Sequence, residues 1–334
     1  MTDLDTLTAE EPTPEEEQLI NSLRAANWSE FIGQPGLKES IQIAIQAAKQ
    51  RQEAMDHVLL YGPPGLGKTT LAHLIAQEMG STLRVTSGTA LAKAGDVAAI
   101  LTNLEPGDVL FIDEIHRLPK IVEETLYPAM EDFALDIILG KGPSARTVRL
   151  DLPRFTLVGA TTRFGALSGP FRDRFGLIHR MQHYQPPELQ EILVKAGQKL
   201  HITLDEESAL AIAERARGTP RIALQLLKRV RDVAQVKYKN QILPGLVQEA
   251  LKMLAVDTLG LTDHDRLFLT VLIEKHRGGP VGLSTIAAAL SEDPNTIEEV
   301  MEPYLLQIGF LQKTPKGRVI TPAAYLHLGF VIPN

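Results

Sequence analysis

Hydrophobic positions divide most of the chain into three successive zones. Between residues 18 and 183, short apolar runs at 58–61, 109–112 and 155–159 alternate with segments of helical periodicity. Continuous apolar runs separated by helices are typical of strands that are buried on both faces of a parallel sheet. This zone therefore predicts an α/β domain.

The two later zones are predicted to be mainly helical. Residues 184–255 begin at Tyr184-Gln-Pro-Pro, where Pro187 suits the first helical position, and further helices are expected near 206–217 and 220–239. The last zone predicts helices at 266–276, 284–290 and 296–308, then two strands, 310–313 and 318–321, around a turn-rich tetrapeptide. Three helices followed by a hairpin are typical of a winged-helix domain.

The expected organisation has four parts: a disordered acidic tail at 1–17, a large α/β domain at 18–183, a small helical domain at 184–255 and a winged-helix domain at 256–334.

Charge changes this picture little. The net charge is −7, but residues 1–17 hold seven acidic side chains and no basic one. The remaining chain therefore balances, and net charge neither supports nor excludes a nucleic-acid partner. No apolar run has the length of a membrane span, no signal peptide is visible, and no membrane association is expected. The absence of cysteine excludes disulfides and thiolate metal sites, and it is compatible with a cytoplasmic location.

A phosphate-binding loop is the strongest chemical feature. The run Gly62-Pro-Pro-Gly-Leu-Gly-Lys-Thr69 matches the P-loop pattern, with an apolar strand before it and a periodic helix after it. Gly62, Gly65 and Gly67 allow backbone N–H groups to converge on phosphate oxygens, and Lys68 would reach the β- and γ-phosphates. The Thr69 hydroxyl would bind Mg²⁺. ATP and Mg²⁺ are the expected ligands.

Two acidic residues end the second apolar run. Asp113 would hold the Mg²⁺ water shell beside Thr69, and Glu114 would act as the general base that polarises the attacking water. The alternative is that this pair merely opens the next helix near its positive dipole end.

Polar residues after the third run, Thr161 and Thr162, are candidates for sensing the γ-phosphate; the alternative is a hydroxyl that caps the next turn.

Two arginines are further candidates. Arg174, in the run 172–175, would stabilise phosphoryl charge only if subunits abut, and a salt-bridged surface turn is the alternative. Arg221 follows Thr219 and Pro220 in the first turn of a helix, where a cation opposes the dipole rule, so it is a candidate phosphate contact or else a solvated arginine.

Together these motifs resemble AAA+ ATPases, and over about residues 20–330 they resemble the RuvB family of bacterial Holliday-junction branch-migration motors. The closest stretches are 56–70, 110–117, 159–163, 172–176, 218–222, 278–283 and 309–312. The resemblance implies an AAA+ P-loop parallel-sheet domain, a small helical lid domain and a C-terminal winged-helix head. It also implies a hexameric ring around duplex DNA that acts with a junction-binding partner, RuvA, and a resolvase, RuvC.

Further site residues follow from this resemblance alone. They are Leu23 and Arg24 beside the adenine, Thr70 in the P-loop, Glu131, Asp132 and Phe133 in a stretch near the nucleotide, Tyr184 as a lid contact, Arg174 as a finger that acts in trans, and Arg221 as the second sensor.

Two surfaces are candidates for macromolecular partners. Lys313, Lys316 and Arg318 cluster on the predicted wing, whereas Glu298, Glu299 and Glu302 in the preceding helix would repel phosphates. We therefore expect the wing to contact only the DNA backbone; the alternative is a wing that only solvates its domain. Ile137, Ile138 and Leu139 are consecutive in a predicted hairpin at 135–150, so at least one should face outward and suit RuvA docking, unless the hairpin packs on its own domain.

Two other functions share some of these features. A clamp-loader-like AAA+ ATPase would keep every nucleotide motif but would not need a winged-helix head. A nucleotide-switched DNA-binding regulator would need no catalytic base such as Glu114.

Overall fold

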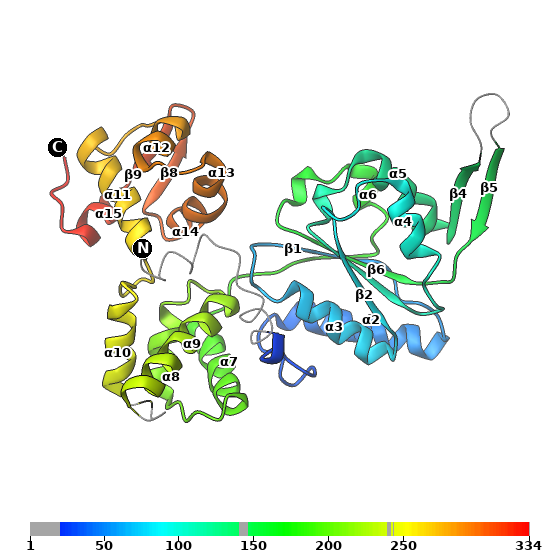
Figure 1. Cartoon of the computed structure of the whole chain (residues 1–334), viewed down its shortest axis with the longest axis horizontal. Helices are drawn as coiled ribbons and strands as arrows, with labels where there is room; N and C mark the ends of the chain where they lie inside the picture. Colours follow the sequence, from blue (N-terminus) through cyan, green and yellow to red (C-terminus); the bar gives the residue numbers. More distant parts are fainter. Residues whose placement is uncertain (1–20, 140–145, 239–241, 243, 334) are drawn as a thin grey trace. The chain divides into compact units, whose positions relative to one another are not determined.

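The computed structural model describes residues 21–139, 146–238, 242 and 244–333, so the acidic tail expected at 1–17 lies outside the described residues. The chain forms two compact units, one from Arg24 to Tyr184 and one that contains Gln185 to the C-terminus (Figure 1). Within the described residues, no helix is both long and apolar enough to cross a bilayer.

The first unit contains a five-stranded parallel sheet with the strand order β2-β3-β6-β1-β7. Its strands are β1 (Val58–Tyr61), β2 (Leu83–Ser87), β3 (Val109–Asp113), β6 (Thr156–Thr161) and β7 (Leu177–Arg180). The three central strands are the three predicted apolar runs, and they are almost wholly buried. The α/β prediction is confirmed. The partly exposed edge strands β2 and β7 were not predicted.

Helices cover both faces of this sheet, as Figure 1 shows, with α2 and α3 on one side and α4 and α5 on the other. Leu101 of α4 and Val122 and Leu126 of α5 pack with Leu110 and Leu157 of the sheet in one buried cluster. The helices of this unit are α2 (Pro35–Arg51), α3 (Lys68–Met79), α4 (Ala94–Leu101), α5 (Lys120–Glu131) and the short α6 (Gly169–Arg172). The covered sheet leaves its strand ends available for a ligand.

A separate antiparallel hairpin, β4 (Ala134–Leu139) and β5 (Arg146–Asp151), extends from the same unit. Both arms of the predicted hairpin therefore form, whereas the turn expected between them lies in 140–145, outside the described residues.

The second unit begins with a group of helices in the region that was expected to be the lid domain, and these are called the lid helices. They are α7 (Pro186–Lys199), α8 (Glu206–Glu214), α9 (Pro220–Lys237) and α10 (Pro244–Met253). The first of them starts at Pro186, so Pro187 is its second residue rather than its first, because Gln185 and Glu188 form a capping box one position earlier than expected.

The rest of the second unit is a winged-helix fold. It contains α11 (Asp263–His276), α12 (Leu283–Leu290), α13 (Pro294–Thr296), α14 (Glu302–Gln307), strands β8 (Leu311–Thr314) and β9 (Gly317–Ile320), and α15 (Pro322–Leu328). The single helix predicted at 296–308 is interrupted by a π-helical segment, Ile297–Met301, and α15 was not predicted. The expected order of a parallel-sheet domain, a helical domain and a winged-helix domain is otherwise confirmed.

Candidate nucleotide site and interaction surfaces

The P-loop joins the buried strand β1 to the N-terminus of α3. Gly62, Gly65 and Gly67 all have positive φ angles, of 143°, 76° and 100°. Backbone of this kind is natural for glycine and strained for other residues. A Cβ atom at Gly62 would lie 2.7 Å from the Met181 carbonyl oxygen, so this position also needs glycine for space. The loop therefore turns sharply and directs the first N–H groups of α3 outward, which is an anion-binding arrangement.

Lys68 is a buried cation at this helix start. Its Nζ donates to the carbonyl oxygens of Gly62 and Pro63, both at 2.9 Å, and the side chain forms no ion pair with a carboxylate in the described part of the chain. Burial lowers the pKa of the Lys68 ammonium, and the charges of Glu114 and Asp113 oppose that shift. An ammonium that is held by neutral carbonyls only is suited to receive an anion from outside the protein.

Asp113 is the last residue of β3 and Glu114 follows it, so the two acids end this strand as predicted. Burial raises the pKa of the Asp113 carboxyl, although a hydrogen bond from the Glu114 N–H at 2.9 Å and the charges of Lys68 and Arg24 act against this. A nearby divalent cation would favour the ionised form. Glu114 is the N-cap residue of the short 3₁₀ helix Ile115–Arg117 and has a left-handed backbone (φ 45°), so it does open a helix, but its carboxylate makes no capping hydrogen bond there.

The Glu114 carboxylate is held by Thr162, which follows the neighbouring strand β6, and by His116, which lies in the 3₁₀ helix directly after Glu114. The Thr162 hydroxyl donates to its Oε2 at 3.1 Å, and the His116 Nδ1 lies 3.1 Å from the same oxygen. The Thr161 hydroxyl lies 2.9 Å from His116 Nδ1 and accepts from the Arg163 N–H at 2.9 Å. Thr162 therefore contacts the candidate base directly, whereas Thr161 combines the turn-capping alternative with a contact to His116.

Sequence reasoning missed His116. The only available signal was its place two residues after Glu114, and nothing in the sequence indicated that a short 3₁₀ helix, Ile115–Arg117, would turn its ring back to the carboxylate.

Magnesium fits the oxygen donors at this strand end. Thr69 lies in the first turn of α3 directly after Lys68, and the charge of Lys68 acts on Asp113. A hydroxyl and a carboxylate are hard oxygen ligands of the kind that Mg²⁺ prefers, usually together with water and substrate phosphates. Thr70, the next residue of the same turn, is half-buried. Within the described residues no group of three histidine or acidic side chains could hold a metal without such help.

Two residues carried over from the resemblance lie close to the loop. The buried Tyr184 donates its hydroxyl proton to the Leu66 carbonyl oxygen at 3.2 Å, inside the P-loop. The charge of Arg24 acts on both Asp113 and His73, which brings it within electrostatic range of the metal-site candidate. Leu23 is a buried side chain.

The candidate finger, Arg174, contacts its own domain. Its guanidinium donates to Glu131 Oε2 at 3.1 Å and to the Pro170 carbonyl oxygen at 2.5 Å, and it stacks 4.1 Å from the centre of the Tyr127 ring. Within one chain the salt-bridged-turn alternative therefore describes its contacts. Its Nε is buried without a partner, so these contacts leave one donor unsatisfied.

The stretch that contains Glu131 has three different environments. Glu131 pairs with Arg174, Asp132 accepts from Arg149 on β5 at 2.6 Å, and Phe133 packs against His57 and Phe155. Glu131 and the finger candidate thus share one surface, whereas Phe133 belongs to the domain's packing.

Arg221 lies in the first turn of α9, as predicted. Thr219 is the N-cap residue, but its hydroxyl donates to the Arg217 carbonyl oxygen at 3.3 Å instead of capping the helix. No residue in the first turn of α9 is acidic, so the positive end of the helix and the Arg221 charge reinforce each other.

The wing differs from expectation in its ion pairs. Glu302 is completely buried, with an exposed side-chain fraction of 0%, and accepts from Arg318 at 2.7 Å and from Lys313 at 2.8 Å. Lys313 and Arg318 also lie 3.0 and 3.5 Å from Glu298. The expectation that all three acids would face and repel DNA is wrong for Glu302, because folding turns it inward to neutralise the wing. Lys316 lies at the turn between β8 and β9 and is exposed.

Apolar residues are exposed on the hairpin. Val148 and Leu150 of β5 are 38% and 37% exposed, and Val148 pairs in register with Ile137. Ile138 and Leu139 lie farther along β4, opposite Thr147 and Arg146.

Comparison with known proteins agrees with this geometry over nearly the whole chain. Family models described as the Holliday junction DNA helicase RuvB P-loop domain, the RuvB AAA lid domain and the RuvB C-terminal winged helix domain match residues 23–181, 184–257 and 258–329. A structure of the Thermotoga maritima RuvB Holliday junction branch migration motor is similar at 50% identity, with a TM-score of 0.84, over 93% of this chain and 100% of the other. A mutant of Thermotoga maritima RuvB is 51% identical with the same TM-score, over 93% and 99% of the two chains.

Proposed function

Because the chain belongs to the RuvB family of Holliday-junction DNA helicases, AAA+ ATPases by class, we propose that it hydrolyses ATP and uses the energy to move duplex DNA during branch migration. The observation that carries this proposal is the position of the Glu114 carboxylate. Thr162 and His116 hold it at the same edge of the sheet as the P-loop. A clamp loader would not need the winged-helix head, and a nucleotide-switched regulator would not need an acidic side chain held there.

Different residues of the chain bind the phosphates, position the P-loop and accept the proton during ATP hydrolysis. Lys68 and the N–H groups of the P-loop bind and orient the phosphates, while Tyr184 fixes the loop at the Leu66 carbonyl. Glu114 accepts the proton of the attacking water. Mg²⁺, held by Thr69 and Asp113, would supply charge neutralisation at the phosphates. Leu23, Arg24 and Thr70 complete the proposed nucleotide contacts, and Arg221 is the proposed second sensor.

The proposal includes a homohexameric ring. Arg174 pairs with Glu131 of its own domain, and a finger that serves a neighbouring subunit would exchange this internal pair for the neighbour's phosphate. Its unsatisfied Nε supports that exchange, because the present contacts do not use every donor.

Mixing two inactive variants tests the ring. Lys68→Met removes the phosphate cation and Arg174→Ala removes the finger, so each variant alone should lose at least about 10²-fold in ATP turnover. A mixture should recover part of the turnover, because some seams then combine an intact Lys68 with an intact Arg174. No recovery, with both variants shown to co-assemble, would contradict a finger that acts in trans.

Partners follow from the same family membership. We propose that RuvA docks on the hairpin through the exposed Val148 and Leu150 together with Ile137, Ile138 and Leu139, and that RuvC acts on the same junction. The wing, with Lys313, Lys316 and Arg318, would contact the DNA backbone. A cytoplasmic location belongs to the proposal, because a motor for bacterial chromosomal DNA needs access to it.

Charging the hairpin tests the RuvA surface. Val148→Asp should abolish RuvA-stimulated ATP turnover and leave the turnover of the isolated protein within about twofold, because an aspartate carboxylate is costly to bury in an apolar contact. Val236→Asp, an 85% exposed valine on α9, is the matched control and should leave RuvA stimulation intact.

The central test is Glu114→Gln, which keeps the size of the side chain but removes the base. ATP should bind with unchanged affinity, while ATP turnover and the disruption of a synthetic four-way junction in the presence of RuvA should both fall at least about 10²-fold. Wild-type protein that hydrolyses ATP but never migrates a junction with RuvA would refute the motor function.

A further inference from the structure

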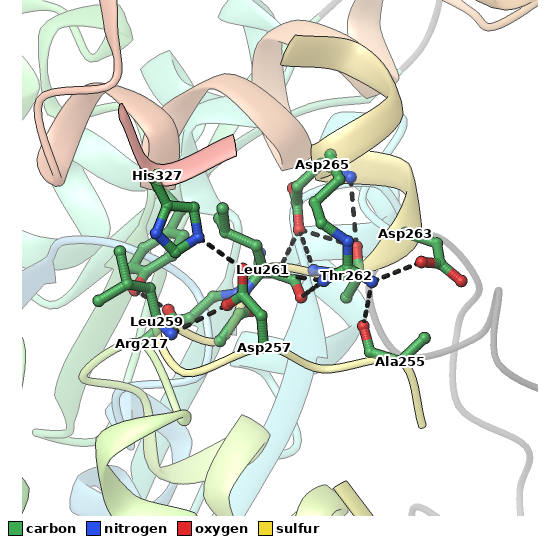
Figure 2. Close-up of polar contacts among 12 residues, drawn as sticks. Arg217, Ala255, Asp257, Leu259, Leu261, Thr262, Asp263, Asp265 and His327 are labelled. Carbon is green, nitrogen blue, oxygen red and sulfur yellow. Dashed lines mark hydrogen bonds and ion pairs between the residues drawn. The ribbon is translucent and has the colours of Figure 1, made fainter. Parts of the chain in front are cut away.

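A buried ion pair connects the lid helices to the winged-helix head. Arg217, in the loop before α9, donates from its Nη2 to the Oδ2 of Asp265 in the first turn of α11, as Figure 2 shows. The two side chains are 6% and 3% exposed, so both charges are almost completely removed from water. Burial of two charges is tolerated only where hydrogen bonds satisfy them well.

Arg217 makes two more contacts across the same junction. Its Nε donates to the Gly260 carbonyl oxygen at 2.8 Å, and its guanidinium lies 4.7 Å from the centre of the Tyr304 ring on α14. One lid side chain thus contacts the connecting segment and two helices of the head. The fork of arginine suits this role, because a lysine ammonium cannot serve the same set of planar contacts.

Asp265 is equally well satisfied from the head side. Its Oδ2 also accepts from the Thr262 N–H at 2.8 Å and from the Thr262 hydroxyl at 2.7 Å, in a capping box that starts α11. Any displacement of α11 therefore moves the carboxylate that holds Arg217.

The connecting segment itself packs tightly against the lid. Gly260 has a φ of 77°, and a Cβ atom there would lie 2.4 Å from the Arg215 carbonyl oxygen. Because not even a methyl group would fit here, the Gly260 backbone packs directly against the Arg215 backbone, and close-packed contacts of this kind transmit displacement rather than absorb it.

Arg217, the lid residue of the ion pair, is close in sequence to a proposed site residue, Arg221. The Arg217 carbonyl accepts from Thr219, the N-cap residue of α9, and Arg221 lies in the first turn of that helix. The distance along the chain from the ion pair to Arg221 is four residues, and the helix start between them is fixed by hydrogen bonds.

We propose that Arg217 and Asp265 are positioning residues that couple DNA contact by the head to the placement of Arg221, so that duplex DNA accelerates ATP turnover through this pair. The inference rests on the proposed function, since it assigns to these residues the communication between the two activities.

The experiment compares three full-length variants with wild-type protein. Arg217→Met removes the guanidinium, and Asp265→Asn removes the charge but keeps an oxygen for Thr262. Arg266→Met is the matched control: Arg266 also ties the connecting segment to α11, through the Ala255 and Leu261 carbonyl oxygens at 2.6 and 2.8 Å, but it lies outside the loop before α9. The measurements are duplex affinity without nucleotide, ATP turnover without DNA, and the ratio of turnover with saturating duplex to turnover without it.

We expect Arg217→Met and Asp265→Asn to bind duplex DNA and to hydrolyse ATP without DNA within about twofold of wild type, while the stimulation ratio falls at least about fivefold. Arg266→Met should keep the ratio. A purely structural role would lower the melting temperature without changing the ratio in molecules that remain folded.

Three outcomes would overturn the inference: an unchanged ratio in either folded variant, an equal loss in Arg266→Met, or failure of both pair variants to fold while Arg266→Met folds. If the Arg217 and Asp265 variants keep a stimulation that wild-type protein also shows, only the coupling is wrong. If wild-type ATP turnover does not respond to duplex DNA at all, the proposed motor function fails together with the coupling.

Discussion

The ATPase unit and the lid–head unit handle buried charge in opposite ways. In the first, Lys68 is buried against two carbonyl oxygens and Asp113 sits at a strand end with its pKa raised by burial. In the second, Arg217 faces Asp265 and Arg318 faces Glu302, and each pair is internally satisfied.

Buried charges without an ion-pair partner mark sites that bind a ligand, whereas complete ion pairs mark structural contacts. An uncompensated buried charge costs folding free energy, and it is retained where something outside the protein supplies the opposite charge. A compensated pair adds little net stability, but removal of either partner leaves the other stranded. Replacement of a buried charged side chain should therefore damage function in the first unit and stability in the second.

The largest expected effect comes from Lys68→Met. ATP turnover (kcat/KM) should fall roughly 10²–10³-fold, because the main cation for the phosphates is lost. The free energy of unfolding of the nucleotide-free protein should stay the same or rise, because the variant no longer buries an ammonium that has only neutral partners. Steady-state kinetics and urea unfolding measure the two effects. A marked loss of stability would show that Lys68 is a structural residue and would break the comparison.

The next effect is on stability. Arg318→Met leaves the fully buried Glu302 with Lys313 alone, and the free energy of unfolding should fall by about 3 kcal/mol. ATP turnover without DNA should not change. Lys316→Met, on the same hairpin but exposed, is the control and should change stability by no more than about 0.5 kcal/mol. Equal losses of unfolding free energy in the two variants would show that the ion pair between Arg318 and Glu302 matters no more for stability than the exposed Lys316.

His57 provides an intermediate case, a buried titratable group that stays neutral. Its Nδ1 accepts from the Leu157 N–H at 2.9 Å and its Nε2 lies 3.1 Å from the Met130 carbonyl oxygen. Burial lowers its pKa below the ordinary 6.5, so as the pH falls below 6.5 the unfolded chain binds a proton that the folded protein does not. Its contribution to stability is therefore complete above pH 6.5 and is lost as the pH falls toward the folded-state pKa.

A non-titrating variant measures this contribution. His57→Asn keeps an acceptor for the Leu157 N–H. Between pH 7 and pH 5.5, wild-type protein should lose more unfolding free energy than the variant, because each unit of pKa difference between the unfolded and folded states is worth about 1.4 kcal/mol. Urea unfolding across this range gives the two slopes, and parallel slopes would mean that His57 titrates normally.

The smallest effect belongs to the wing. Because Lys313 and Arg318 are engaged with Glu298 and Glu302, Lys316 should carry more of the DNA contact than either of them. Lys316→Ala should weaken binding to all duplex sequences alike and reduce the slope of log Kd against log salt by about 1. Lys313→Ala should change that slope less. The reverse order would show that DNA competes successfully with the internal ion pairs.

Features with a local sequence pattern were predictable, whereas long-range pairings were not. The buried strands β1, β3 and β6 are continuous apolar runs, and the P-loop has a fixed spacing. The edge strand β2 was missed because its central residues Arg84 and Val85 are exposed and leave no apolar run. Pairings such as Arg318 with Glu302 depend on how the chain folds back, which no spacing along the sequence encodes.

The same limit applies inside the site. Glu114 and Thr162 were predicted separately from two strand ends, but their contact follows from the sheet order that makes β3 and β6 neighbours. Without that order, the sequence offered no reason to join Thr162 to the acid or to include His116.

Gly260 makes the spacing between two domains depend on a missing methyl group. Any other residue at this position would act as a wedge against the Arg215 carbonyl, in a backbone conformation that L-amino acids avoid. Substitutions of increasing bulk at this one position would then provide a graded series in which lid and head are forced apart step by step, while every residue that handles nucleotide or DNA keeps its identity.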